Sequence, residues 1–441
     1  MLKVLAHPVY ARLFAAQVVA LIGTGLLTVA LGLLAFDLAG ERAGIVLGTA
    51  YAIKMVAYVG LAPVTQALAV RLPRRTVLVA ADLIRASVAL ALPFIDAIWQ
   101  VYVLIFVLQA ASATFTPAFQ AVIPDILPEE EDYTQALALS RLAYDLENLA
   151  SPALAGLLLT VVGYSWLFTG TTLGFLASAA LVMTTTLPAA ASVARPFLDR
   201  VTRGTRLYLA TPRLRGLLAL TMTAAALSAF VLVNTVVAVQ GVYGRDQTSV
   251  ALVLAAFGTG SMLAALGLPT LLHRVSDRTA MLGAALLLCL AALVTAALWL
   301  RDGPPPWPLL LGAWMLFGLG YSGIVTPSGR LLRRSAHPED RPALFAAQFA
   351  LSHACWLLTY PLAGWGGDAF GLPGVLLGLA GLGGVSALIA ARLWRPETEA
   401  PLPHDHPDLP SDHPHLRAHG AGSAHRHPIV IDDRHPIWPR G

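Results

Sequence analysis

Long apolar segments recur along almost the whole chain, and they constrain its fold more than any other feature. A helix needs roughly 20 apolar residues to cross the hydrocarbon core of a bilayer. Segments of that length lie near residues 14–36, 44–68, 77–97, 100–122, 136–161, 164–187, 216–238, 249–271, 279–300, 308–328, 343–364 and 372–394. Because only 12% of the residues are charged and 57% are hydrophobic, polar groups are too few to cover a soluble protein. The sequence therefore predicts an all-α, multi-pass protein with twelve transmembrane helices in the cell (inner) membrane.

The longest polar break between these segments, Pro188–Arg215, contains six arginines and divides the helices into six plus six. The two halves also resemble each other, since Thr116-Pro117 and Pro128–Asp132 recur as Thr326-Pro327 and Pro338–Asp340, at an offset of roughly 210 residues. A duplicated six-helix unit is typical of secondary transporters, whose substrate site lies where two pseudo-symmetric bundles meet. The predicted parts are an N-terminal six-helix bundle (1–187), a cytoplasmic linker (188–215), a C-terminal six-helix bundle (216–394) and a tail (395–441).

Arginines are unevenly distributed between the loops, which predicts the orientation in the lipid bilayer. Besides the linker, one set of loops carries Arg71, Arg74, Arg75, Arg274, Arg278, Arg330, Arg333, Arg334 and Arg341, whereas the other set has only Arg42, Arg245 and Arg301. The positive-inside rule then places both termini in the cytoplasm. The net charge of +4 is explained by these loops and does not indicate a nucleic-acid partner. We find no nucleotide-binding loop and expect neither an enzyme nor a cofactor.

Several motifs resemble a known family over roughly residues 10 to 395. Gln66–Arg75 is similar to the loop between helices 2 and 3 of the major facilitator superfamily, although Val70 replaces the usual Asp, so the charge-relay role of that Asp is not implied. Phe115-Thr-Pro-Ala and Ser151–Gly156 resemble the exporter branch that contains macrolide and siderophore efflux proteins. Phe345–Pro361, together with the tail, is similar to bacterial nickel-resistance permeases. The resemblance implies a secondary transporter and, in its narrowest form, nickel as the cargo.

Ionisable residues inside the apolar segments are candidates for function, because a charge at the bilayer centre is costly unless it faces protein or water. They are Lys54, Asp82, Arg85, Arg141, Asp145, Glu147 and His353. In the segment 136–161, Arg141, Asp145 and Asn148 share one helix face, while Glu147 points about 200° away from Asp145. In one interpretation Arg141 pairs with Asp145 and Glu147 meets a partner such as Lys54, in a fixed packing network. In the other, Asp145 or Glu147 alternately holds a proton and a cargo cation.

The other buried ionisable residues also allow two interpretations. His353 is either a metal ligand and proton carrier or a buried histidine bonded to a neighbouring hydroxyl or carbonyl. Lys54 would repel a divalent cation unless a carboxylate neutralises it, and so favours an anionic or organic cargo. Asp82 and Arg85, spaced i, i+3, are predicted to form a local pair that supports the loop between the second and third helices. With Arg71, Arg74 and Arg75 they form a set of predicted structural or gating residues.

Histidines are concentrated in the tail, which is rich in Pro, Asp and Gly and is predicted to be disordered without a ligand. The predicted metal ligands are His404, His406, His413, His415, His419, His425, His427 and His435. Imidazoles two residues apart on a flexible chain can close on one ion, and nitrogen and oxygen ligands suit Ni²⁺, Co²⁺, Zn²⁺ or Cu²⁺. The tail would then collect metal for export or sense it. The alternatives are a solubilising or a pH-responsive tail.

These patterns together lead to one main hypothesis and two alternatives. The main hypothesis is proton-coupled export of a divalent transition metal, nickel first and cobalt second, by alternating access around Asp145, Glu147 and His353. The first alternative is a drug or siderophore exporter of the same superfamily, which Lys54 favours. The second, from another class, is a membrane metal sensor whose transporter body no longer moves cargo.

Overall fold

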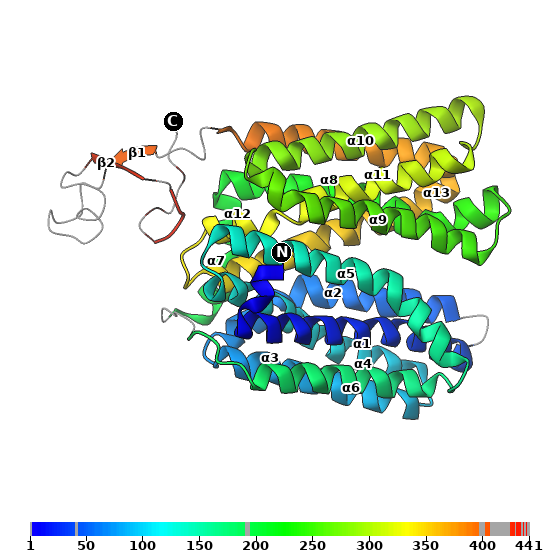
Figure 1. Ribbon diagram of the computed structural model, residues 1–441, viewed down its shortest axis with the longest axis horizontal. Helices are drawn as coiled ribbons and strands as arrows, with labels where there is room; N and C mark the ends of the chain where they lie inside the picture. The colour runs from blue at the N-terminus through cyan, green and yellow to red at the C-terminus, as the bar shows by residue number, and fades with distance from the viewer. Residues whose placement is uncertain are drawn as a thin grey trace.

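The computed structural model describes residues 2–39, 43–189, 195–396, 402–405, 424–427, 429–433, 435 and 438. Its long elements are helices (Figure 1). They are α1 (Pro8–Ala39), α2 (Ala43–Ala69), α3 (Arg74–Ala91), α4 (Ile98–Ile126), α5 (Glu130–Leu159), α6 (Ser165–Met183), α7 (Phe197–Ala210), α8 (Pro212–Val236), α9 (Gln247–Leu272), α10 (Asp277–Asp302), α11 (Trp307–Val325), α12 (Ser328–Arg334) and α13 (Arg341–Leu393). Shorter elements are the 3₁₀ helices η1 (Leu2–Ala6) and η3 (Leu92–Phe94), the π-helix η4 (Val237–Val242) and the strands β1 (Leu402–Asp405) and β2 (Ala424–His427).

The predicted membrane crossings are confirmed within the described residues. Ten helices are long and apolar enough to cross a bilayer, and α5 has 30 residues but also carries several charged ones, of which Asp145 is buried. The 53-residue α13 is interrupted at Gly371, whose φ of 69° and ψ of 168° are not helical. Glycine adopts this conformation without the Cβ clash that other residues meet, and Pro373 follows it. The break separates the predicted segments 343–364 and 372–394, so that α13 crosses the membrane twice and the total is twelve.

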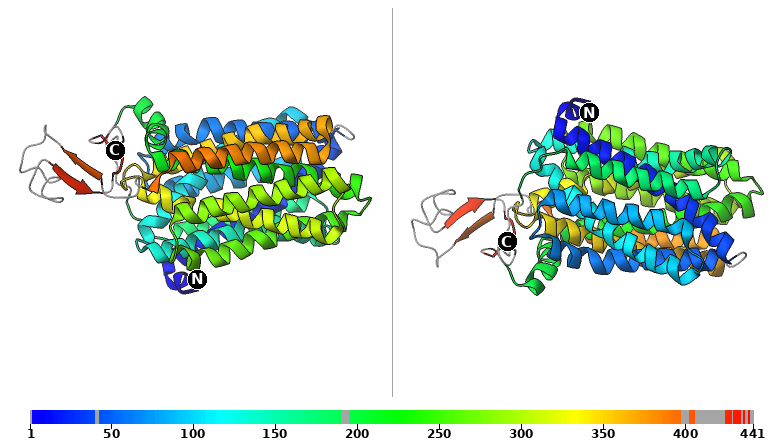
Figure 2. Two further views of the ribbon diagram at one scale, coloured as in Figure 1. Left: turned by 90° about the horizontal axis from the view of Figure 1, so that it is seen from above. Right: turned by 90° about the horizontal axis from the view of Figure 1, so that it is seen from below.

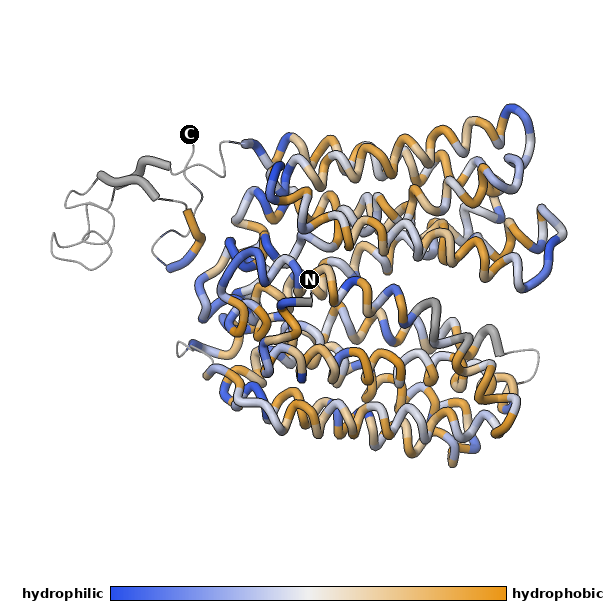
Figure 3. Tube along the Cα trace, in the orientation of Figure 1, coloured by the Kyte–Doolittle hydropathy of each residue, from blue (hydrophilic) through white to orange (hydrophobic). Residues whose placement is uncertain are grey.

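The helices form two bundles that lie side by side (Figure 1). One contains α1 to α6 and the other α8 to α11 with α13, and α2, α4 and α5 contact α9 and α13 between them. Both chain termini lie at the same end of the helices in all views (Figures 1 and 2), which we call the terminal end. Hydrophilic residues gather at the helix ends, and apolar residues cover most of the helix lengths (Figure 3). This distribution is the one that a bilayer requires of helices that cross it.

Close packing inside the C-terminal bundle depends on small residues where α9 crosses α11. A Cβ atom added to Gly260 would lie 1.8 Å from the backbone oxygen of Met315, and one added to Gly318 would lie 1.8 Å from the oxygen of Phe257. Small residues let membrane helices approach this closely. Trp314 and Phe230 fill the adjacent core, with ring centroids 6.0 Å apart. The position of α9 relative to α11 is therefore fixed by backbone contact.

The linker contains a helix, α7, which packs against the start of α13. A Cβ atom added to Gly204 of α7 would lie 1.9 Å from the backbone oxygen of Ala343. Arg203 donates two hydrogen bonds to the Asp340 carboxylate, at 3.0 and 2.8 Å. The linker is thus held against the C-terminal bundle by a bidentate ion pair.

The described part of the tail is ordered, in contrast to the predicted disorder. Strands β1 and β2 pair antiparallel, with His404 opposite His425 in the register and Leu402 opposite His427. Further along, Ile429 and Ile431 are buried against the core of the C-terminal bundle. His406, His413, His415 and His419 lie outside the described residues. The short apolar group Ile429–Ile431, between His427 and His435, explains the docking of this segment, because it supplies a hydrophobic anchor to an otherwise polar tail.

Charged groups also hold the end of the tail against the bundle. Asp433 accepts hydrogen bonds from Arg195 at 2.5 Å and from Arg203 at 2.6 Å, and the arginines lower the pKa of its carboxyl. His435 binds Asp432 through its backbone N–H at 2.7 Å and through its ring Nδ1 at 3.1 Å. His337, next to the start of α13, places its Nε2 3.4 Å from the other Asp432 oxygen. The described end of the tail is therefore docked by both apolar and ionic contacts.

This docking is expected to weaken as the pH rises. The hydrogen bond to Asp432 is the main cause that raises the pKa of His337, and together with the charges of Asp432, Glu339 and Asp340 it outweighs the opposing effect of partial desolvation. Because the pKa of His337 is raised in the docked state, protonated His337 stabilises docking. This stabilisation is complete below the ordinary histidine pKa of about 6.5 and is lost as the pH rises through the raised pKa. The protection factor for amide hydrogen exchange at residues 429–433, which corrects for the intrinsic rise of exchange with pH, should fall a few-fold across that window, an effect kept small by the exposure of His337. In His337→Gln the protection factor should change less with pH there, and an unchanged pH profile of the protection factor in this variant would contradict the assignment.

Candidate transport site

The polar face of α5 meets the opposite bundle at Asp145. This residue is 3% exposed and forms an ion pair with Arg141, one helical turn earlier. Its second carboxylate oxygen accepts a hydrogen bond of 2.6 Å from the Ser261 hydroxyl of α9. The predicted pair of Arg141 and Asp145 is therefore present, and it is linked to the C-terminal bundle by a contact that the sequence did not predict.

Arg141 itself lies against aromatic rings of the C-terminal bundle. Its guanidinium is 5.0 Å from the centre of the Tyr321 ring on α11. Tyr321 in turn contacts Phe257 of α9 and Trp356 of α13, with ring centroids 5.8 and 6.2 Å apart. A desolvated guanidinium over an aromatic face is stabilised by a cation–π interaction. The positive side of the ion pair thus contacts an apolar, π-rich surface contributed by the other bundle.

Glu147 points away from this interface, as the helix geometry predicts. Its Cγ would lie 3.6 Å from a Cβ atom added to Gly25, so it packs toward α1 within its own bundle. Lys54 of α2 is its main electrostatic partner, although Lys54 makes no direct ion pair with any described residue. The side chain of Asn148 lies outside the described residues. Asp145 and Glu147 therefore face different neighbours on opposite sides of α5.

A second group between the bundles joins α2 to α13. The ammonium of Lys54 lies 5.6 Å from the centre of the Tyr58 ring. Tyr58 contacts His353 edge-on at 4.6 Å and Phe349 at 4.8 Å between ring centroids. The His353 Nδ1 is 2.7 Å from the Phe349 carbonyl oxygen. Since a carbonyl only accepts, Nδ1 carries the hydrogen, and Nε2 is the remaining acceptor of the neutral ring.

The described residues do not assemble a metal site. Among them, no group of three or more His, Cys, Asp or Glu side chains is arranged to hold an ion. Asp145, Glu147 and His353 were predicted to surround the cargo, but they occupy three different environments. His353 uses a ring nitrogen on a backbone carbonyl, as the structural interpretation of this residue expected. Instead, aromatic rings lie between the bundles, with Lys54 beside Tyr58 and Arg141 beside Tyr321.

Asp82 and Arg85 form the predicted pair, but its location differs from the prediction. Both are buried, Asp82 accepts a 2.8 Å hydrogen bond from Ser178 of α6, and the Arg85 guanidinium lies 4.3 Å from the ring centre of Phe115 on α4. The pair thus connects α3 to α6 and α4 inside the N-terminal bundle and does not support the loop between α2 and α3. The position two turns into α3 is the reason, since it lies beyond reach of that loop.

At the terminal end, ion pairs connect the bundles. Asp125 of α4 accepts hydrogen bonds from Arg74 of α3 at 2.6 Å and from Arg341 of α13 at 2.7 Å. A second ion pair joins Glu130 of α5 to Arg330 of α12. Arg74 therefore belongs to this group of ion pairs, and Asp125, which sequence reasoning missed, is the carboxylate that bridges the bundles.

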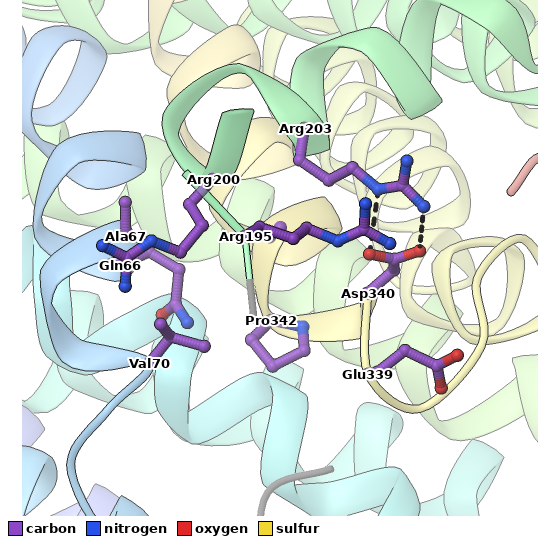
Figure 4. Close-up of a pocket in the computed structure, with 10 residues that line it drawn as sticks. Gln66, Ala67, Val70, Arg195, Arg200, Arg203, Glu339, Asp340 and Pro342 are labelled. Atoms are coloured by element: carbon purple, nitrogen blue, oxygen red, sulfur yellow. Dashed lines mark hydrogen bonds and ion pairs between the residues drawn. The ribbon is translucent and has the colours of Figure 1, made fainter. Parts of the chain in front are cut away.

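The other predicted gating arginines, Arg71 and Arg75, are exposed at this end. Near them, a small recess is lined by Gln66 in the last turn of α2 and Val70 just after it, by Arg195 and Arg203, and by Asp340 (Figure 4). Arg195 lies beside the paired Arg203 and Asp340 side chains in this view. The loop between α2 and α3 therefore meets the linker and the start of α13 at one place. A movement of one bundle relative to the other would change the contacts of the linker there.

Comparison with known proteins agrees with this architecture. A family model described as transmembrane secretion effector matches residues 2–317, and the model of the major facilitator superfamily matches residues 216–431. The macrolide efflux protein A of Streptococcus pyogenes is 29% identical over 154 residues, which are 34% of this chain and 37% of that protein. The chain thus matches little more than a third of the length of this relative.

Two solved structures show the same fold. The human organic anion transporter MFSD10 has a TM-score of 0.74 at 14% identity, covering 87% of this chain and 98% of that one. A bacterial homologue of the iron transporter ferroportin, in its outward-facing state, has a TM-score of 0.69 at 14% identity with the same coverage. At this identity the likeness concerns the fold alone. Since the secretion-effector model, which describes one branch of the major facilitator superfamily, spans most of the chain, and the general model of the superfamily matches its C-terminal part, this protein belongs to the major facilitator superfamily.

Proposed function

We propose that this protein exports organic, drug-like molecules from the cell. The observation that carries the proposal is the composition of the surfaces between the bundles, where Tyr58 and Phe349 form one aromatic group and Tyr321, Trp356 and Phe257 another. Aromatic side chains with a few placed polar groups are typical of sites for organic ligands. The likeness to a macrolide efflux protein supports the same conclusion. Lys54 beside Tyr58 adds a cation that disfavours a divalent metal.

We further propose that export is coupled to protons through the carboxylates of α5. Asp145 is bound to Ser261 across the interface, so that gain of a proton by Asp145 would weaken a link between the bundles. Glu147 faces Lys54 within its own bundle and is the second candidate. Arginines at the terminal end favour a cytoplasmic location for both termini. In that orientation the ion pairs of Asp125 and Glu130 close the cytoplasmic side and the arrangement corresponds to an outward-facing state.

A divalent transition metal remains the second candidate cargo, because the tail concentrates histidines between His404 and His435. In this version the tail collects Ni²⁺ or Co²⁺ and passes it to the transporter body. Replacing all tail histidines would also change His435, which contacts Asp432, and deleting the tail would remove the docked residues 429–433. A sharper variant changes to glutamine only the histidines from His404 to His427 and leaves the docked segment intact.

A tolerance panel distinguishes the candidates. Cells that express the protein should tolerate a several-fold higher concentration of a macrolide and no more Ni²⁺ than control cells. The histidine-to-glutamine variant should behave like the unchanged protein. If the protein raises nickel tolerance and this variant does not, the cargo is a metal and the proposal of an organic cargo is wrong. A nickel response without efflux of either compound would instead indicate a membrane sensor.

A further inference from the structure

A cavity of about 240 Å³ lies between the two bundles at the terminal end. Its walls are Glu130 and Tyr133 of α5 on one side, and Arg330, Arg333 and Arg334 of α12 with Arg341 of α13 on the other. Glu130 is 51% exposed, so the cavity reaches the protein surface beside it. The cavity is distinct from the aromatic groups between the bundles, and four of its six lining residues are arginines.

The positive charge around this cavity is only partly balanced. Arg330 and Arg334 share Asp277, which is almost completely buried. Arg341 shares Asp125 with Arg74, and Glu130 pairs with Arg330. Five arginines therefore face three carboxylates among the described residues. The unbalanced cations are confined to a place from which water is partly excluded, where their mutual repulsion is stronger than in bulk water.

Arg333 shows the imbalance most directly, since it forms no ion pair among the described residues, and the nearby Glu130 pairs with Arg330. Its Nη2 donates to the backbone oxygen of Pro128, and its guanidinium lies 5.3 Å from the ring centre of Tyr133. Three buried polar atoms at the cavity have no hydrogen-bond partner in the described structure: the Tyr133 hydroxyl, the Arg333 Nη1 and the Arg341 Nε. Tyr133 is completely buried. Buried donors of this kind are rare, because each loses its hydrogen bond to water.

We propose that this cavity binds a phosphate-type oxyanion, either free inorganic phosphate or the headgroup of an anionic phospholipid. A tetrahedral oxyanion supplies the negative charge that the arginines lack and several acceptors for the unpartnered donors. Bound there, it contacts α5 of one bundle and α12 and α13 of the other. An anion that binds only when these helices are close together would stabilise the state in which the terminal end is closed. The site does not depend on which cargo the protein carries.

Binding can be measured on the full-length protein in detergent. Inorganic phosphate, titrated against chloride at constant ionic strength, should raise the unfolding temperature in a saturable way. In parallel, protein in nanodiscs of phosphatidylglycerol should unfold at a higher temperature than in phosphatidylcholine, and native mass spectrometry should detect the retained lipid. Stabilisation by phosphate identifies the free anion as a ligand, and stabilisation by phosphatidylglycerol alone identifies the headgroup. No stabilisation by either would overturn the proposal.

Variants locate the effect. Arg333→Gln should weaken binding of the anion about tenfold or more, because a charge-assisted hydrogen bond is lost. Tyr133→Phe removes only a hydroxyl that has no other partner, and should weaken binding several-fold without lowering the unfolding temperature of the anion-free protein. The matched control is Arg301→Gln, at the opposite end of the helices, where the side chain is 82% exposed. Wild-type affinity in Arg333→Gln, or an equal loss in the control, would rule out this cavity as the site.

Discussion

Asp145→Asn is expected to abolish transport and to destabilise the protein by about 3 kcal/mol, the usual range for breaking a buried ion pair. The substitution keeps the shape of the side chain but leaves the Arg141 guanidinium desolvated and without its counter-charge. It also changes an acceptor that holds the Ser261 hydroxyl of the other bundle. Thermal unfolding of the purified protein and efflux of a radiolabelled macrolide from proteoliposomes measure the two effects separately.

A double variant separates a structural from a transport role. Arg141→Gln combined with Asp145→Asn removes both charges, and replacing a whole buried pair is often close to neutral for stability. If Asp145 carries the proton, the double variant should regain most of the lost stability and still fail to transport. Ser261→Ala removes only the hydrogen bond between the bundles and should cost about 1 kcal/mol. Normal transport by Asp145→Asn, or recovery of transport in the double variant, would show that the pair only stabilises the helix.

Much of the fold could be predicted because the bilayer imposes its rules on each helix separately. The length of each apolar segment predicted a crossing, and the spacing of residues on one helix predicted that Asp145 and Glu147 point in different directions. The pairing of Arg141 with Asp145 is also local to α5. Gly371 was not singled out, although the two predicted segments on either side of it were found. Features that depend on one helix or on its length were thus accessible from sequence.

Contacts between helices could not be predicted in the same way. Ser261 lies among small residues of α9, and its hydroxyl gives no sign that it meets a carboxylate of α5. Asp125 lies 216 residues before its partner Arg341 in the chain, and Tyr321 is similarly far from Arg141. The group Ile429–Ile431 is too short to show any periodicity, so the docked end of the tail was predicted to be disordered. Tertiary packing decides these contacts, and a single sequence contains no direct record of it.

Asp125→Asn is expected to open the terminal end of the protein. Asp125 is the common acceptor of Arg74 in one bundle and Arg341 in the other, with a side chain only 15% exposed. Without the carboxylate, the two guanidinium groups repel each other across the interface. The loss of a partly buried, doubly used ion pair should cost about 2 kcal/mol, which changes the ratio of closed to open molecules about thirtyfold. Asp125→Glu keeps the charge and should restore most of the closed population.

Spin labels report this change directly. Labels at Leu72 and Arg274, in terminal-end loops of the two bundles, should move apart in Asp125→Asn, while labels at Asp96 and Asp302 at the opposite end should approach each other. The matched control is Asp368→Asn, an exposed carboxylate at the opposite end that has no ion pair among the described residues. Unchanged distances at both ends would mean that the contact of Glu130 with Arg330 suffices to close the terminal end. A change in distance at the terminal end alone would show that the bundles flex locally. Opposite changes at the two ends would require the bundles to rock as rigid bodies, which is expected because packed helices rearrange between discrete states.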